Sequence, residues 1–259
     1  GAASLDPVSG SIDPYNILIT GASGLVGRAL VERLREGGSQ VFPLSRRSDA
    51  GALEPWQWRP ESGEIRLGNE PIHAVVHLAG ENIAGRLWSA RQKQRLTVSR
   101  VKATETLCAA LVATGREAPR VMVSASGVVY YGDRGDERLR EDSEPGDGFL
   151  AELAERWEAA SAVLDTHGVR RVQARFGMIL APHGGALAKM ALPFRWGLGG
   201  RLGSGKQYWS WVAIEDVLSF LTTAIEDPRY QGAFNVVAPH LVTNREFTRD
   251  LAQAMRRPV

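Results

Sequence analysis

Short apolar runs alternate along the first two thirds of the chain with segments in which apolar residues recur every three or four positions. The runs predict strands at Asn16–Thr20, Val41–Leu44, Ala74–Ala79, Val121–Ser124 and within Arg171–Leu180. The longer periodic segments predict helices over 26–36, 89–113 and 149–165. Such an alternation is typical of an α/β fold with a doubly wound, parallel, Rossmann-type sheet.

The last third of the chain has a different texture. Residues 195–205 are rich in Gly and Arg and predict a loop, 214–225 an amphipathic helix, and 234–237 a strand. Thr243 and Glu246 have the spacing of a capping box at the start of a last helix. We therefore expect a disordered tail or linker at 1–14, a Rossmann domain at 15–180 that also receives 206–237, and a smaller C-terminal substrate lobe from 181–205 and 238–259.

Composition narrows the class of protein. The chain has 259 residues, of which 44% are hydrophobic and 23% charged, as in a soluble globular protein. Cys108 is the only cysteine, so no internal disulfide can form, and either a reducing compartment or a redox-indifferent protein is expected. Neither a long apolar run nor a secretory signal pattern is present, and the net charge of +2 is scattered. We expect a cytoplasmic protein that binds neither membranes nor nucleic acid.

A glycine-rich turn lies between the first predicted strand and the first predicted helix. Its sequence, GASGLVG over 21–27, has the spacing Gly-x-x-Gly-x-x-Gly. Glycine permits a tight turn and a close approach to a pyrophosphate, and the following helix start supplies free N–H groups. We expect the turn to bind a dinucleotide through Gly21, Ser23, Gly24, Leu25, Val26 and Gly27.

The end of the second predicted strand bears on the choice of dinucleotide. An acidic residue at this position hydrogen-bonds the adenosine ribose of NAD. Here the strand ends in Ser45, Arg46 and Arg47, with no acid. Guanidinium groups bind phosphate in a forked geometry, so these residues favour NADP(H) with its 2′-phosphate.

With these features the sequence resembles the extended short-chain dehydrogenase/reductases, in the atypical branch called nucleoside-diphosphate-sugar epimerase-like. The matching stretches include ITGASGLVG (19–27), VVHLAGENIAGRLW (75–88), VSASGVVYYGDRGDE (123–137) and GLGGRLGSGKQYWSWVAIEDV (197–217). The resemblance implies further cofactor contacts at His77, Leu78, Ala79, Gly80, Ser124, Arg175, Gly177 and Met178. Members usually run on past the position of Val259, so we expect a truncated substrate lobe.

The catalytic pattern of that superfamily is incomplete. Its enzymes use a tyrosine with a lysine four residues on, whose charge lowers the phenol pKa. The residues four before the four lysines are Ser89, Val98, Gly185 and Leu202, so the pair is absent. Ser126 fits the inherited catalytic serine. Tyr131 is a candidate proton donor, although it would equally serve to pack the pocket wall. Arg100 falls near the position of the family's active-site asparagine.

Aromatic and basic residues cluster in the Gly/Arg-rich segments. Together they are candidates to bind an anionic, partly planar small-molecule substrate: Arg86, Trp88, Phe194, Arg201 and Trp211. Packing between the lobes explains the same residues equally well. His77 and Glu81 lack further ligands nearby, so no metal site is expected.

Two functions remain open at this point. The first is an NADP(H)-dependent oxidoreductase or epimerase acting on a sugar-nucleotide-like or other carbonyl substrate, with Ser126 binding the carbonyl oxygen. The second is a non-catalytic NADP(H)-binding sensor or interaction protein, because the proton-transfer pair is missing. Substrate identity, reaction direction and oligomeric state stay undetermined.

Overall fold

A computed structural model describes residues 15–81, 83, 89–113, 115–182, 184–195, 200 and 203–256. The expected tail at 1–14 lies outside these residues. No helix in this described part combines the length and the hydropathy that crossing a bilayer requires.

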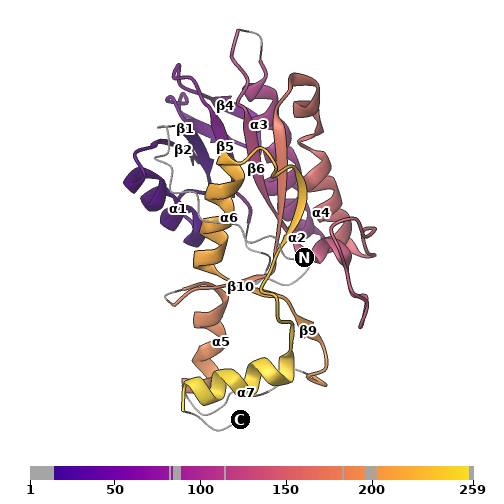
Figure 1. Cartoon of the computed structure of the whole chain (residues 1–259). Coiled ribbons are helices and arrows are strands. Elements are labelled where there is room, and N and C mark those ends of the chain that lie inside the picture. The colour runs from indigo at the N-terminus through magenta and orange to yellow at the C-terminus, as the bar shows by residue number, and fades with distance from the viewer. Residues whose placement is uncertain are drawn as a thin grey trace.

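A central sheet of eight strands forms the body of the molecule (Figure 1). The strands follow the order β11-β7-β6-β5-β1-β2-β3-β4. They are β1 (Asn16–Thr20), β2 (Gln40–Arg46), β3 (Gln57–Arg59), β4 (Glu64–Arg66), β5 (Ala74–His77), β6 (Val121–Gly127), β7 (Arg170–Phe176) and β11 (Gly232–Val236). All neighbours pair in parallel except β3 and β4. The expected doubly wound Rossmann-type sheet is confirmed.

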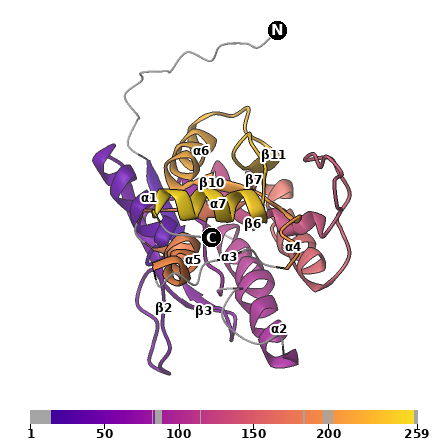
Figure 2. The same ribbon diagram turned by 90° about the horizontal axis from the view of Figure 1, so that it is seen from below.

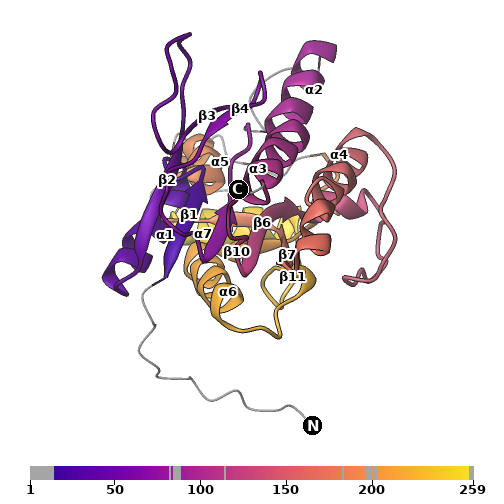
Figure 3. The ribbon, with the colours of Figure 1, turned by 90° about the horizontal axis from the view of Figure 1, so that it is seen from above.

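Helices cover both faces of the sheet, as the view from above shows (Figure 3). On one face lie α1 (Leu25–Glu36) and α6 (Ile214–Glu226), whose Leu30 and Val217 are fully buried against the strands. On the other lie α2 (Ala90–Thr97), α3 (Ala103–Leu111) and α4 (Phe149–Ala159). Each sheet face thus has its own apolar core, and the strands carry the continuous hydrophobic pattern that two covered faces require.

Three local features differ from the sequence-based expectations. The β3–β4 hairpin was not predicted, because its two strands consist mostly of polar residues. The helix expected over 89–113 contains a π-helical turn at Val98–Lys102, between α2 and α3. The segment 171–180 forms two strands, β7 and β8 (Met178–Leu180), and β8 pairs with β10 (Trp211–Ala213) outside the main sheet.

The C-terminal lobe lies beyond one edge of the sheet. It contains α5 (Gly185–Arg195), β9 (Tyr208–Trp209), β12 (Val242–Thr243), which pairs with β9, and α7 (Asn244–Ala254). Helices α5 and α7 and strand β9 lie below the sheet in Figure 1, and α7 lies across the molecule in Figure 2. The Thr243 side chain accepts from the Glu246 amide, and the Glu246 carboxylate accepts from Thr243. The expected capping box is therefore confirmed as the start of α7.

Candidate cofactor and active site

The glycine-rich turn joins β1 to α1 as a tight loop. A side chain at Gly27 would place its Cβ 2.1 Å from the Gly21 carbonyl oxygen, and Gly21 itself has a positive φ of 71°. Gly24 caps α1 in an extended conformation and offers no side-chain cap, so the first amides of α1 have no side-chain acceptor there. The loop is thus a cradle into which a pyrophosphate fits.

The arginines at the end of β2 differ in their surroundings. Arg47 donates to the Asp49 carboxylate at 2.6 Å and to the Ala52 carbonyl at 2.7 Å, so the following loop holds its guanidinium. Arg46 has only a 3.5 Å ion-pair contact with Glu61, and its side chain is 47% exposed. Of the two, Arg46 is the guanidinium that can turn toward a 2′-phosphate.

His77 is the last residue of β5, and its side chain lies in the protein interior. Its side chain is fully buried, with Nδ1 2.7 Å from Thr20 Oγ1 and Nε2 2.9 Å from Thr104 Oγ1. Thr104 donates its own proton to the Arg100 carbonyl, so it accepts from Nε2–H. Burial lowers the pKa of His77 to about 4, which keeps the ring neutral at neutral pH. The imidazole therefore ties β1, β5 and α3 together and is not available to a cofactor.

The backbone after His77 is positioned by the same residues. The Leu78 and Ala79 amides donate to Thr20 Oγ1 at 3.1 and 3.0 Å. Ser124, beside His77 in the neighbouring strand, is buried, and its Oγ has no hydrogen-bond partner in the described structure. An unpaired buried hydroxyl in the middle of β6 fits a site that a bound cofactor would complete.

A cavity of about 540 Å³ lies at the carboxyl edge of the sheet, between α4 and the strands that lead to the C-terminal lobe. Gly177 and Met178, two of the expected cofactor residues, line it together with Ser126. The remaining lining is mostly apolar and comprises Ile83, Arg100, Gly127, Val128, Val129, Leu150, Leu153, Ala154, Trp157, Phe176, Ile179, Tyr208, Trp209 and Ser210. Ligands bind at this edge in parallel α/β sheets, which makes the cavity the candidate active site.

Ser126 is held at this cavity by a buried ion pair. Its hydroxyl donates to Glu158 Oε1 at 2.7 Å, and Arg175 donates to both oxygens of that carboxylate at 2.8 Å. The Arg175 side chain is 4% exposed and that of Glu158 12%. Burial alone would lower the pKa of Arg175, but its hydrogen bonds to Glu158 and Tyr131 outweigh burial and raise it. The Arg175 side chain thus holds the Glu158 carboxylate.

The predicted role of Tyr131 does not fit its position. The residue is 2% exposed and does not line the cavity. Its hydroxyl donates to Asn235 Oδ1 at 2.6 Å and accepts from Arg175 at 2.9 Å. The phenol supports Arg175 from behind, which corresponds to the packing role that the sequence left open.

The helix α4 turns an apolar face to the cavity. Leu150 and Ala154, four residues apart, both line it. This is the spacing of the superfamily's tyrosine and lysine, so side chains without a titratable group stand where that pair would act. Glu158, one turn further along, was missed by the sequence analysis. The available signal was a carboxylate one turn beyond Ala154, on the side of α4 that carries its buried residues.

Two of the five predicted substrate residues lie in the described part of the chain, Phe194 and Trp211. Arg86, Trp88 and Arg201 lie outside the described residues. Phe194 is buried in α5, and neither it nor Trp211 lines the cavity, whereas Tyr208 and Trp209 do. For the described residues, packing is therefore the better explanation of Phe194 and Trp211. The described part of the chain brings together no group of three or more His, Cys, Asp or Glu that is suited to a metal ion.

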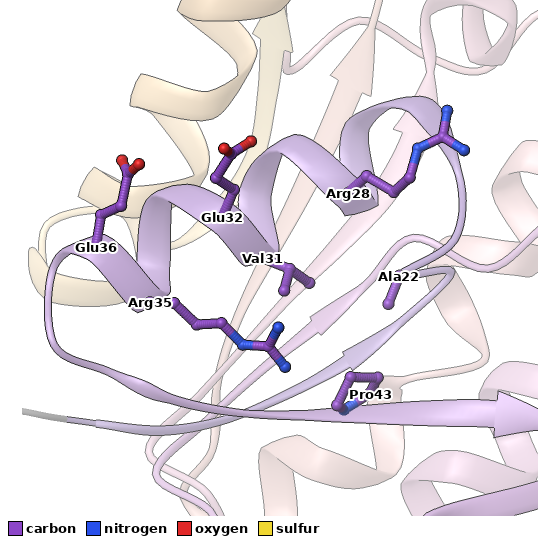
Figure 4. Close-up of a pocket in the computed structure, with 7 residues that line it drawn as sticks. All are labelled: Ala22, Arg28, Val31, Glu32, Arg35, Glu36 and Pro43. Atoms are coloured by element: carbon purple, nitrogen blue, oxygen red, sulfur yellow. The ribbon is translucent and has the colours of Figure 1, made fainter.

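A second hollow, of about 430 Å³, lies between α1 and β2 and is lined by Ala22, Arg28, Val31, Glu32, Arg35, Glu36 and Pro43 (Figure 4). In the close-up, Glu32 and Glu36 point away from β2 while Val31 faces Pro43. None of the predicted site residues lines this second hollow, so the cavity at Ser126 remains the candidate site.

The sheet order, the glycine cradle and the edge cavity together define a dinucleotide-binding protein of the Rossmann class. Comparison with known sequences then identifies the family. The profile of the NAD dependent epimerase/dehydratase family matches residues 17–237, and the chain belongs to that family. The resemblance seen in the sequence is thereby confirmed.

Individual relatives cover most of the chain. Epimerase family protein Mb2239 of Mycobacterium bovis is 42% identical over 243 residues, which are 93% of this chain and 79% of that protein. The crystal structure of human epimerase family protein SDR39U1 (isoform 2) with NADPH has a TM-score of 0.83 and 34% identity, covering 93% of this chain and 80% of that chain. MoeE5 in complex with UDP-glucose and NAD, at 22% identity and a TM-score of 0.74, shows the shared fold alone.

Proposed function

We propose that this protein is an NADP(H)-dependent oxidoreductase or epimerase that acts at a hydroxyl- or carbonyl-bearing carbon of a small molecule held in the Ser126 cavity. One observation carries the proposal: Ser126 lines an edge cavity and is hydrogen-bonded to a buried carboxylate. The likeness to a human relative solved with NADPH, and the exposed Arg46 at the end of β2, support NADP(H) as the cofactor. When bound, the cofactor supplies or accepts the hydride.

The direction of the Ser126 hydrogen bond determines what this residue can do. The hydroxyl has one proton, and Glu158 accepts it, so the lone pairs of Oγ are left for a donor. A substrate alcohol can therefore donate to Ser126. As the alcohol is oxidised, its proton passes to Ser126 while the serine proton moves to Glu158. Carbonyl reduction is the reverse, with the proton starting on Glu158.

Other residues set the conditions for that transfer. Arg175 fixes the Glu158 carboxylate by two hydrogen bonds, which holds Ser126 in one orientation. The side chains of Leu150, Leu153 and Val129 give the cavity around Ser126 an apolar lining. This arrangement replaces the missing tyrosine and lysine with a serine and a carboxylate.

The test is NADPH oxidation, followed by absorbance, against a library of aldehydes, ketones and sugar nucleotides. We expect turnover on at least one compound, and a loss of about a hundredfold to ten-thousandfold in kcat for Ser126→Ala. The matched control is Ser39→Ala. Ser39 is also a buried serine, but it directly precedes β2 and does not line the cavity, so this variant should keep full activity. Turnover that persists in Ser126→Ala would overturn the assigned role.

A second candidate function has its own observation. Because Leu150 and Ala154 occupy the cavity face of α4, the protein could bind NADP(H) without turning over, as a sensor of the cofactor's redox state. Tight NADPH binding together with no oxidation of any library compound would favour this second function.

A further inference from the structure

The π-helical turn at Val98–Lys102 places one arginine in the active-site cavity. A π-helical turn inserts an extra residue into a helix, and such turns recur at functional sites. Arg100 lies within this turn, is only 6% exposed, and lines the same cavity as Ser126. The helix irregularity therefore delivers a guanidinium to a largely apolar space.

Arg100 has neutral partners. Its Nη2 donates to the backbone oxygen of Glu81 at 2.8 Å, and its guanidinium carbon lies 5.1 Å from the Trp157 ring centroid. The carboxylate of Glu81 pairs instead with Arg95 at 3.0 Å. Among the described residues, no carboxylate is within ion-pair distance of Arg100, in contrast to Arg175 with its bidentate Glu158.

A buried charge that forms no direct ion pair is costly to the folded state, and the more distant Glu81 carboxylate offsets only part of the effect of burial on the Arg100 pKa. Burial lowers the pKa of Arg100 to about 10, so the guanidinium still carries its charge at neutral pH. Such a group gains most from a ligand that brings one negative charge into the cavity. The free protein bears the free-energy cost of burying the Arg100 charge, and binding of such a ligand offsets it.

We propose that Arg100 binds a carboxylate of the substrate, and that the substrate is a hydroxy or oxo acid with an apolar body. This inference rests on the proposed oxidoreductase function and names its substrate class. Ser126 would meet the hydroxyl or carbonyl oxygen, Arg100 the carboxylate, and side chains such as Leu153 and Met178 the apolar body.

The lining of the cavity favours a carboxylate over a sugar diphosphate. A diphosphate brings at least two charges, whereas Arg100 is the one cationic side chain among the described lining residues. A sugar needs a hydrogen-bond partner for each hydroxyl, and an apolar wall leaves those hydroxyls unpaired at a cost. A planar carboxylate matches the fork of a single guanidinium.

The experiment measures binding of apolar 2-oxo and 2-hydroxy carboxylates, and of their methyl esters, by calorimetry in the presence of saturating NADPH. The wild type should bind at least one acid roughly tenfold to a hundredfold more tightly than its ester. Arg100→Gln keeps a donor for the Glu81 carbonyl but lacks the charge, and should lose this preference. Arg100→Lys should retain part of it. The control Arg91→Gln, at an exposed position of α2, should match the wild type.

Three outcomes would overturn the proposal: no acid preferred over its ester, a preference that survives in Arg100→Gln, or a loss confined to NADPH affinity. If Arg100→Gln does not fold, the wild-type preference and Arg100→Lys still decide the matter. Acid binding through Arg100 without NADPH oxidation would leave this proposal standing and remove the proposed function. Turnover of neutral carbonyl compounds without a preference for acids would support the proposed function and overturn the carboxylate site at Arg100.

Discussion

The hydroxyl of Ser126 donates to Glu158 Oε1 across 2.7 Å, so a serine at the cavity is coupled to a carboxylate 32 residues away. Glu158 in turn is held by Arg175, and Arg175 by the phenol of Tyr131. A continuous hydrogen-bond network therefore connects α4, β6 and β7 at the carboxyl ends of the strands. Through this network the Glu158 carboxylate can exchange a proton with Ser126 without the help of a lysine.

The Glu158–Arg175 pair should matter for stability. Glu158→Gln leaves the Arg175 charge buried and uncompensated, and we expect a loss of up to about 3–5 kcal/mol in the free energy of unfolding. Urea denaturation measures it. The matched control is Asp165→Asn, which breaks the more exposed pair with Arg171 and should cost at most about 1 kcal/mol. Equal losses in the two variants would contradict the argument from burial.

Substitutions of Arg46 and Arg47, at the end of β2, should affect cofactor affinity to different extents. A charged hydrogen bond contributes about 1.5–3 kcal/mol, so Arg46→Ala should weaken NADPH binding by roughly 10- to 150-fold and leave NADH binding almost unchanged. Arg47→Ala should have the smaller effect, because Asp49 and Ala52 already hold its guanidinium. Titrations at one fixed salt concentration compare them. Tighter binding of NADH than of NADPH by the wild type would contradict the assignment to NADP(H).

Substitutions at Gly27 and Gly24 should affect different properties, the first stability and the second cofactor binding. At Gly27 a Cβ would lie 2.1 Å from the Gly21 carbonyl oxygen, so Gly27→Ala should prevent the β1–α1 packing and destabilise the protein. At Gly24 the nearest contact is 3.2 Å, so Gly24→Val should fold but obstruct the approach of the pyrophosphate. Circular dichroism melts and NADPH titrations distinguish the two. A Gly24→Val variant that binds NADPH like the parent would show that the loop is not the phosphate site.

His77 should make stability depend on pH. Its pKa falls from 6.5 to about 4 on folding, so between these values the unfolded chain binds a proton that the folded one does not. Stability is therefore fully present above about pH 6.5 and is lost as the pH falls, by roughly 3 kcal/mol in total. His77→Gln should flatten this part of the profile, whereas His167→Gln, at an exposed position, should not. An unchanged slope in His77→Gln would contradict the neutral, buried imidazole.

Much of the fold follows from periodicity, because buried parallel strands and amphipathic helices leave strong patterns. The β1 strand has the predicted boundaries, and the glycine turn lies where its sequence context requires. The β3–β4 hairpin was not predicted, because each strand has three residues with a single apolar one, which is too short to show a periodic pattern. The hydrogen bond between Ser126 and Glu158 was not predicted for another reason. Tertiary contacts between distant elements leave no local sequence pattern. The only sign of such a contact is a polar residue on an otherwise buried helix face.

Hydride transfer from the cofactor can be followed with an isotopic label. NADPH carrying deuterium at the transferring carbon is incubated with the protein and the carbonyl library, and products are analysed by mass spectrometry. We expect the wild type to add one deuterium to at least one alcohol product. With Ser126→Ala, at equal NADPH occupancy, the rate of deuterium transfer should fall by about a hundredfold or more. Deuterium transfer at an equal rate in both proteins, or none to any compound by the wild type with NADPH bound, would contradict it.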